Sequence, residues 1–129
     1  MNYLHLCVFR HYNPANSTIS SEQMNHFLSA SFSSNLEDIP GVGKAANDHF
    51  MHPSENPELC PIFNAYQLYG KFFSLKGNAI DSVAHCELFF KWLVNKGINH
   101  NTSNIVQAVA TRANLMMPGI YDGNQTTQI

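Results

Sequence analysis

The most informative part of the chain reads Leu36-Glu37-Asp38-Ile39-Pro40-Gly41-Val42-Gly43-Lys44-Ala45-Ala46. Pro40 and the two glycines predict a tight turn, because glycine adopts backbone angles and permits close approaches that other residues resist. The apolar residues on either side, from Leu36 to Phe50, have the spacing that packs a short helix against a second one. We therefore predict a helix-hairpin-helix motif here.

A second helix that begins at Gly43 would present its unpaired N–H groups and the positive end of its dipole to solvent. Such a helix start is a ready anion site. The candidate ligands for a phosphate are the amides near Gly41, Gly43, Lys44 and Ala45, with the Lys44 ammonium nearby. Backbone contacts of this kind do not reach the base edges, so binding to a nucleic acid would not depend on its base sequence.

The alternative to a phosphate site is a plain turn between two helices, closed by a glycine. Leu36, Ile39 and Phe50, at helical spacing around the turn, favour the phosphate site over this alternative. A nucleotide-binding P-loop is excluded, because Gly43-Lys44 has no glycine five residues before it and no Ser or Thr after it.

Length and composition indicate one globular domain. The chain has 129 residues, and an apolar fraction of 44% is enough for a packed core. No apolar run approaches the roughly 18 residues of a membrane span, and the stretch from Tyr3 to Phe9 is too short and broken for a signal peptide. We therefore expect an intracellular protein, nuclear or cytoplasmic, with no membrane insertion. Cys7, Cys60 and Cys86 are odd in number and widely spaced, so they imply no disulfide framework.

The charge balance argues against strong electrostatic binding. Seven Lys and Arg residues against nine Asp and Glu residues give a formal net charge of -2. Proteins that neutralise many phosphates are usually basic. Any binding of nucleic acid must therefore depend on few contacts, on backbone dipoles, or on the doubling of sites in a dimer.

The rest of the chain has helical periodicity, with no alternating strand pattern beyond a short N-terminal segment. Ser20, with Gln23 three residues later, is a capping box that opens a helix over about 21–29. Gly97 ends another helix over about 82–95. Residues 99–103 can cap a last helix.

We predict an all-α fold, a compact bundle of about five helices. Residues 1–19 form an N-terminal extension, 20–118 the helical domain, and 119–129 a flexible C-terminal tail. The sequence leaves open whether the extension folds onto the domain.

Two adjacent stripes of apolar side chains run along the helix expected over 62–75. A monomer of this size covers only one stripe well, and the other would be an exposed apolar patch, which usually marks an interaction surface. We therefore predict a homodimer, with an interface formed by Tyr66, Tyr69, Gly70, Phe72 and Phe73. The alternative is one larger core in which the helix over 82–95 covers both stripes.

The order and spacing of several segments also carry a family resemblance. These segments are Phe27-Leu28, Leu36-x-x-Ile39-Pro40-Gly41-Val42-Gly43, Phe63-Asn64-Ala65-Tyr66-Gln67-Leu68-Tyr69-Gly70-Lys71-Phe72, Leu75-Lys76, Phe89-Phe90-Lys91-Trp92-Leu93, Gly97-Ile98-Asn99, and Ser103. Over about residues 27–115 the chain resembles the barrier-to-autointegration factor family. The Ala-Tyr-x-Leu-x-Gly-x-Phe and Phe-x-x-Trp-Leu elements are specific in combination.

The resemblance implies a SAM-like helical homodimer that binds double-stranded DNA without sequence preference and bridges two duplexes. It implies a non-enzymatic role in chromatin and at the nuclear envelope, with LEM-domain proteins and lamins as further partners. The DNA contacts that it implies are Gly41, Val42, Gly43, Lys44 and Ala45 in the hairpin, and Asn99, His100, Asn101, Thr102 and Ser103 at the start of the last helix.

Some positions depart from the family pattern. Asn47 stands where the family usually has a small residue, and Asp48 and His49 stand near positions that are usually basic. The loops at about 51–61 and 77–84 are longer than those of the family. These departures and the net charge of -2 support a second hypothesis, a dimeric protein-interaction module of the same fold with little or no DNA affinity.

We expect no cofactor, no metal site and no catalytic site. His49 and His52 lie three residues apart near Cys60, a set that could bind zinc, but solvent-facing histidines are the simpler interpretation. Cys86 falls on the apolar face of its helix and should pack as a small hydrophobe. No nucleophile-base-acid pattern and no pair of carboxylates indicates an enzyme. The aromatic residues of 63–73 could stack bases, but their helical spacing favours core and interface.

Overall fold

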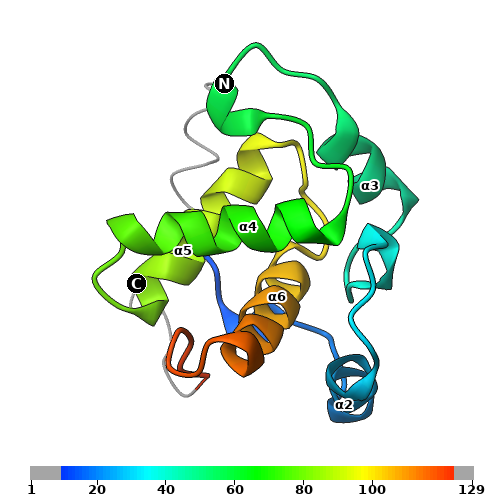
Figure 1. Ribbon diagram of the computed structural model, residues 1–129, viewed down its shortest axis with the longest axis vertical. Coiled ribbons are helices and arrows are strands. Elements are labelled where there is room, and N and C mark those ends of the chain that lie inside the picture. Colours follow the sequence, from blue (N-terminus) through cyan, green and yellow to red (C-terminus); the bar gives the residue numbers. More distant parts are fainter. Residues whose placement is uncertain (1–9, 124–129) are drawn as a thin grey trace.

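The computed structural model describes residues 10–123, and this part of the chain is all-helical, with five α-helices and no strand (Figure 1). The α-helices are α2 (Ser21–Ser29), α3 (Lys44–Met51), α4 (Ala65–Leu75), α5 (Ser82–Asn95) and α6 (Thr102–Met116). Short 3-10 helices are η1 (Pro14–Asn16), η2 (Leu36–Asp38), η3 (Pro57–Leu59) and η4 (Lys76–Asn78). The prediction of an all-α bundle of about five helices is confirmed.

The core lies where α4, α5 and α6 pack against one another, as Figure 1 shows. Phe72 of α4 and Phe89 of α5 are completely buried, with ring centroids 5.1 Å apart in an edge-on arrangement. Val109 of α6 and Phe50 of α3 are buried in the same core. Burying each large apolar side chain contributes about 1.5–3 kcal/mol. This core therefore fixes α3, and with it the hairpin, against the longer helices.

One stripe of α4 faces entirely inward. Ala65, Leu68 and Phe72 have no exposed surface, and Tyr69 is also buried. The predicted dimer interface needs a correction here, because the subunit's own core already covers Phe72 and most of Tyr69. Tyr66, with 66% of its surface exposed, lies on the outer side of the helix.

The start of α4 also differs from the prediction. The Asn64 side chain accepts a hydrogen bond from the Gln67 N–H at 2.9 Å, so the helix begins at Ala65 rather than at 62. Ile62 belongs to the preceding loop, where its N–H donates to the Phe50 carbonyl at 2.7 Å. The side-chain cap thus starts the helix three residues later than the apolar periodicity alone indicates.

Two other helix starts can be compared with their predicted caps. The Ser20 hydroxyl accepts a hydrogen bond from the Gln23 N–H at 3.0 Å, as the capping box predicts. The last helix begins at Thr102, and the side chain of Asn101 before it makes no capping hydrogen bond. The expectation that a side chain of residues 99–103 caps this helix is therefore wrong, because Asn101 adopts a left-handed conformation with φ 56°.

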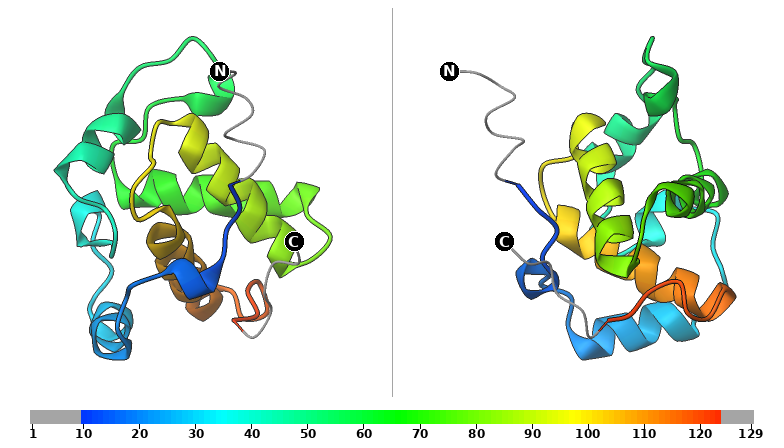
Figure 2. Two further views of the ribbon diagram at one scale, coloured as in Figure 1. Left: turned by 180° about the vertical axis from the view of Figure 1, so that it is seen from behind. Right: turned by 90° about the vertical axis from the view of Figure 1, so that its left-hand side faces the viewer.

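Residues 10–19 are part of the folded domain. Tyr12 is buried, and its N–H donates to the Glu87 carboxylate of α5 at 3.0 Å. The Thr18 N–H donates to the Asn104 side-chain oxygen of α6, also at 3.0 Å. Figure 2 shows this segment running along the back of the molecule beside α5 and α6. The domain therefore begins before residue 20, and residues 1–9 of the predicted extension lie outside the described residues.

The segment after α6 returns to the same region. Ile120 is buried, and the hydroxyl groups of Tyr121 and Tyr12 lie 3.2 Å apart. Residues 119–121, predicted as the beginning of a flexible tail, therefore pack on the domain, and residues 124–129 lie outside the described residues. Across 10–123, no helix combines the length and the apolar character that crossing a membrane requires.

Candidate nucleic-acid interface

The hairpin contains a tight turn over residues 39–42. The Val42 N–H donates to the Ile39 carbonyl at 3.0 Å, and Gly41 has a φ of 98°. Proline before a residue with positive φ is the arrangement of a type II turn, which favours glycine at its third position. The first half of the motif is only the 3-10 helix η2, shorter than the predicted helix. Val42 is buried, so any ligand contact at this position is limited to its backbone.

Gly41 brings the turn directly against the start of α6. A Cβ atom on Gly41 would lie 3.0 Å from the Asn104 Cβ and 3.0 Å from the Ile105 Cγ1. It would also lie 3.2 Å from the Asn101 carbonyl oxygen. Only glycine fits this approach. The structure thus places the two segments predicted to bind DNA, the hairpin and the start of the last helix, next to each other.

The start of α3 is open to solvent. Gly43 has an extended conformation with φ -106°, and no side-chain cap covers the first amides of the helix. Gly43, Lys44 and Ala45 are exposed. The first N–H groups of α3 are therefore free of any side-chain cap from Gly43, at a part of the helix that is exposed.

The start of α6 offers a second set of backbone amides. Asn101 provides no side-chain cap for them. The Thr102 hydroxyl donates inward, to the Ile98 carbonyl at 3.1 Å, and Ser103 is buried. Asn99 and His100 are exposed, and the Asn99 side chain accepts a hydrogen bond from Arg10 at 2.8 Å. Among the predicted ligand residues of this segment, Asn99 and His100 are therefore exposed, whereas Thr102 and Ser103 are buried.

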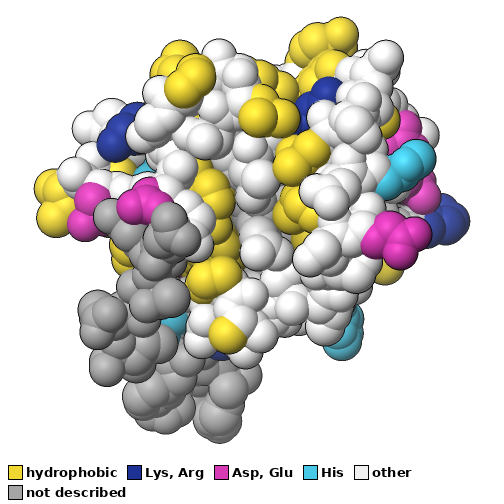
Figure 3. Space-filling model, turned by 90° about the horizontal axis from the view of Figure 1, so that it is seen from below, with side chains coloured by type: hydrophobic (Ala, Val, Ile, Leu, Met, Phe, Trp, Pro, Cys, Tyr) yellow, Lys and Arg dark blue, Asp and Glu magenta, His cyan; other side chains and the backbone are white. Residues whose placement is uncertain are grey.

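Acidic groups surround the hairpin. The Lys44 ammonium lies 3.4 Å from the Asp48 carboxylate, in a pair that is exposed on both sides. Glu37 accepts a hydrogen bond from the Asn47 side chain at 3.1 Å, and Asp38 accepts one from a serine of the preceding loop. Figure 3 shows that much of the lower face carries hydrophobic and uncharged side chains, with few Lys or Arg. The field around the amides is therefore less favourable to phosphate than the backbone geometry.

Arg112 of α6 is used to hold α2. Its guanidinium donates to the carbonyls of Phe27 at 2.6 Å and Ala30 at 3.0 Å, at the end of α2. It also lies over the rings of Phe27 and Phe32, at 5.3 and 5.7 Å from their centroids. Local sequence patterns do not reveal this role of Arg112, because its partners Phe27 and Ala30 lie 85 and 82 positions away.

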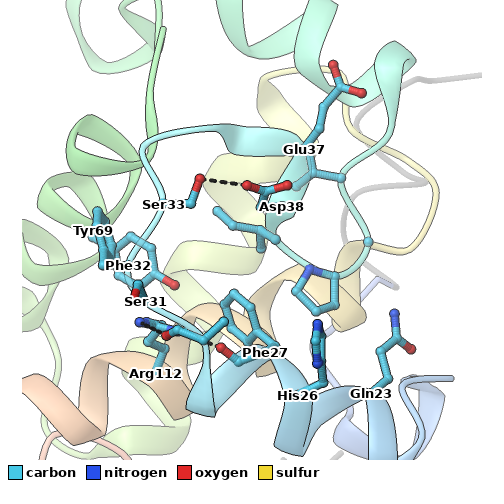
Figure 4. Close-up of a pocket in the computed structure, with 15 residues that line it drawn as sticks. Gln23, His26, Phe27, Ser31, Phe32, Ser33, Glu37, Asp38, Tyr69 and Arg112 are labelled. Carbon is cyan, nitrogen blue, oxygen red and sulfur yellow. Dashed lines mark hydrogen bonds between the residues drawn. The ribbon is translucent and has the colours of Figure 1, made fainter.

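A pocket of about 600 Å³ lies between α2 and the hairpin (Figure 4). Figure 4 shows Phe27, Phe32 and Arg112 on one side and Glu37 with Asp38 on the other. The turn itself, Pro40 to Val42, lines part of the pocket. The acidic side of the pocket adjoins the hairpin, so it disfavours a phosphate at this particular face.

The outer surface of α4 and the end of α6 form an apolar groove of about 650 Å³. Tyr66 and Phe73 line it from α4, and Leu115 and Met116 line it from α6. Gly70 also lines the groove and is exposed. Tyr66, Gly70 and Phe73 of the predicted interface thus lie together on this surface, joined by side chains of α6 that the sequence analysis did not include.

The residues weighed as metal ligands do not form a cluster. Among the described residues, no group of three or more His, Cys, Asp or Glu is positioned for a metal. The His49 ring packs on Gly97, where a Cβ atom would lie 2.8 Å from its Nδ1. Cys86 is buried, and burial raises the pKa of its thiol to about 12.

The chain matches no protein-family model, no curated protein and no solved structure. The likeness to the barrier-to-autointegration factor family therefore stays a prediction that rests on the quoted segments.

Proposed function

We propose that this protein binds duplex DNA through its phosphates, without sequence preference, and that a homodimer bridges two duplexes. One observation carries the proposal: Gly41, in the turn that leads into α3, packs against the start of α6, and neither helix start has a side-chain cap. Backbone amides at two adjacent helix starts suit neighbouring phosphates of one strand. The chromatin role and the nuclear or cytoplasmic location belong to the same proposal, through the family resemblance.

The homodimer is supported by the apolar groove between α4 and α6. Tyr66 and Leu115, which both line this groove, have 66% and 61% of their surface exposed. The hydroxyl of Tyr69, which also lines the groove, is buried and has no hydrogen-bond partner in the described structure. Two copies joined here would present two hairpins, so that weak phosphate contacts add through valency.

The second candidate function is a protein-interaction module with little DNA affinity, for which the resemblance implies a LEM-domain or lamin-like partner. Glu37, Asp38 and Asp48 around the hairpin favour it, because they oppose the approach of phosphate. Under this candidate the apolar groove is the functional surface, and the hairpin only supports α3.

A negative charge placed at the start of α3 distinguishes the two candidate functions by experiment. Gly43→Asp adds a residue whose Cβ has no atom within 4 Å and whose carboxylate caps α3, so the fold tolerates it. The carboxylate occupies and repels the phosphate position. Gly77→Asp is the matched control, because Gly77 also has open space around its Cβ and lies in η4, away from the hairpin.

The measurement is a mobility shift of a labelled duplex, begun at about 50 mM salt, where electrostatic association is strong. We expect affinity that ignores sequence and falls gently with salt, loss of binding in Gly43→Asp, and normal binding in Gly77→Asp. Equal loss in both variants would assign the binding to net charge alone. No binding by the unaltered protein would leave the interaction module as the function.

A further inference from the structure

A second pocket, of about 390 Å³, lies where residues 10–16 cross the start of α6. Arg10 and His11 line it from the N-terminal segment, and Asn101, Thr102 and Ser103 line it from α6. Its position next to the hairpin follows from the contact of Gly41 with Asn101 and Asn104.

Ser103 points to a ligand in this pocket. Only 6% of its surface is exposed, and it lines the pocket. Its hydroxyl makes no hydrogen bond to any group in residues 10–123, although a helical serine often donates to a carbonyl four positions earlier. The hydroxyl oxygen is not among the fully buried unpaired polar atoms of residues 10–123, so it can be reached from the pocket. A ligand that accepts a hydrogen bond can therefore pair with it there.

The other groups in the pocket suit an anion. The amides at the start of α6 have no side-chain cap, and α6 has 15 residues, so its positive end is well developed. The Arg10 guanidinium is held by the Asn99 side chain at 2.8 Å and lies over the Phe90 ring at 5.5 Å from its centroid. Arginine has five N–H donors, so some remain for a ligand.

No carboxylate lines this pocket, in contrast to the pocket beside the hairpin. Glu87 of α5, an acidic partner of the pocket residue His11, accepts a hydrogen bond from the Tyr12 N–H at 3.0 Å and lies 3.1 Å from the His11 Nδ1. Both of its oxygens are therefore engaged by the N-terminal segment itself. The pocket is left with one permanent charge, the positive charge of Arg10.

We propose that this pocket binds one phosphate group, with Arg10 as its cation and the Ser103 hydroxyl and the first amides of α6 as its donors. As a site for a phosphodiester of DNA, the pocket rests on the proposed DNA binding. Arg10 then supplies a cation close to the acidic hairpin, in a chain whose net charge is -2. The site requires the N-terminal segment, which lies outside the part of the chain that resembles the family.

Inorganic phosphate tests the pocket without DNA. Phosphate replaces chloride at constant ionic strength, and amide shifts are followed by NMR. We expect the Thr102 and Ser103 amides to shift together, and Arg10→Gln and Ser103→Ala each to weaken phosphate binding about tenfold, the effect of one lost charged hydrogen bond. Lys76→Gln, with the same change of charge outside the pocket, should leave the affinity unchanged. Absence of shifts at both amides, or equal loss in Lys76→Gln, would overturn the proposal.

A salt titration with duplex DNA identifies the source of the phosphate. If the ligand is the DNA backbone, Arg10→Gln should lower the slope of log affinity against log salt by about one. Amide shifts with phosphate but no binding of duplex would keep the pocket as a free-phosphate site and reject the DNA function. Duplex binding that Gly43→Asp abolishes, with no amide shifts in phosphate, would keep the DNA function and reject this pocket.

Discussion

The two glycines of the hairpin differ in what they contribute to the protein. Gly41 has a φ of 98° and lies against Asn104 and Ile105, whereas Gly43 has an ordinary extended conformation and open space around it. Backbone strain and close packing therefore concern Gly41 alone. The sequence motif treats both glycines alike, so this difference appears only in the structure.

We predict that Gly41→Ala destabilises the fold while Gly43→Ala changes it little. The left-handed conformation costs a residue with a Cβ about 1–2 kcal/mol, and overpacking against α6 adds about 1–3 kcal/mol. Gly43→Ala should cost less than about 1 kcal/mol, as the loss of a favourable N-cap. Urea unfolding measures both variants. Equal stability of the two would show that the turn does not need a positive φ.

His85 gives the fold a dependence on pH. Its Nε2–H donates to the Phe72 carbonyl at 2.7 Å, and the buried Nδ1 has no partner in the described part of the chain. Burial lowers the pKa of His85, opposed by the bond to Phe72 and assisted by Lys76. The unfolded chain then binds the proton more readily than the folded one. The stability from the neutral ring is therefore present above about pH 6.5 and is lost as pH falls through the lowered pKa.

We expect the free energy of unfolding, measured in urea at a series of pH values, to fall on acidification below about pH 6.5. His85→Phe should be less stable at neutral pH, because the Phe72 carbonyl loses its donor, but its stability should depend less on pH. His26→Gln is the control, since His26 is exposed. A pH dependence that survives His85→Phe unchanged would assign the effect to other groups.

At the level of elements, local capping signals were predictable and loop packing was not. The capping box at Ser20 and the glycine stop at Gly97 both follow from short-range chemistry. The start of α4 was misplaced because Ile62 continues the apolar period while its N–H bonds to Phe50 outside the helix. Periodicity reports which side chains are apolar, but it does not report where the backbone hydrogen bonds go.

Lys96 anchors the long loop after α3. Its ammonium is buried and lies within hydrogen-bond distance of three carbonyl oxygens, those of His52 at 3.5 Å, Leu59 at 3.1 Å and Cys60 at 3.3 Å. Burial lowers the pKa of this lysine, and the proximity of Cys60 partly offsets the shift. These hydrogen bonds hold the loop against the end of α5. The amino-acid composition of the loop does not indicate this contact.

We predict that Lys96→Met frees the loop over residues 52–60 without unfolding the helices. The variant keeps the apolar stem but removes the donors, at a cost of about 1–3 kcal/mol. Hydrogen exchange should rise in this loop and stay unchanged in α4 and α6. Lys91→Met, an exposed position of α5, is the control. Unchanged exchange of the loop in Lys96→Met would mean that its own turns hold it in place.

At the level of the whole molecule, we predict a homodimer that is closed by the groove between α4 and α6. Light scattering at micromolar concentration should give twice the 14.5 kDa mass of the chain. Tyr66→Glu and Leu115→Glu should each shift the equilibrium to monomer by placing a charge in an apolar contact. Ile80→Glu is the control, because Ile80 is 94% exposed and lies outside the groove. A monomer mass for the unaltered protein would reject the dimer and the bridging of two duplexes.

One part of the candidate site could be predicted from the sequence, and the other part could not. The hairpin follows from a short run of residues, and glycine chemistry is enough to predict it. The proposed phosphate pocket combines Ser103, one of the predicted DNA contacts, with Arg10, which is held there by Asn99, 89 positions away in the sequence. No local pattern in one sequence contains that information, so only the three-dimensional structure assigns it.

The packing of residues 10–19 on α6 sets an order of events during protein synthesis. Thr18 leaves the ribosome well before its partner Asn104, 86 positions later, and at about 5–20 residues per second that gap lasts roughly 4–17 seconds. Until α5 and α6 have both emerged, the segment lacks the two helices that it packs on. A nascent chain interrupted before α6 therefore carries the complete glycine turn but has neither the helix start beside it nor the second pocket.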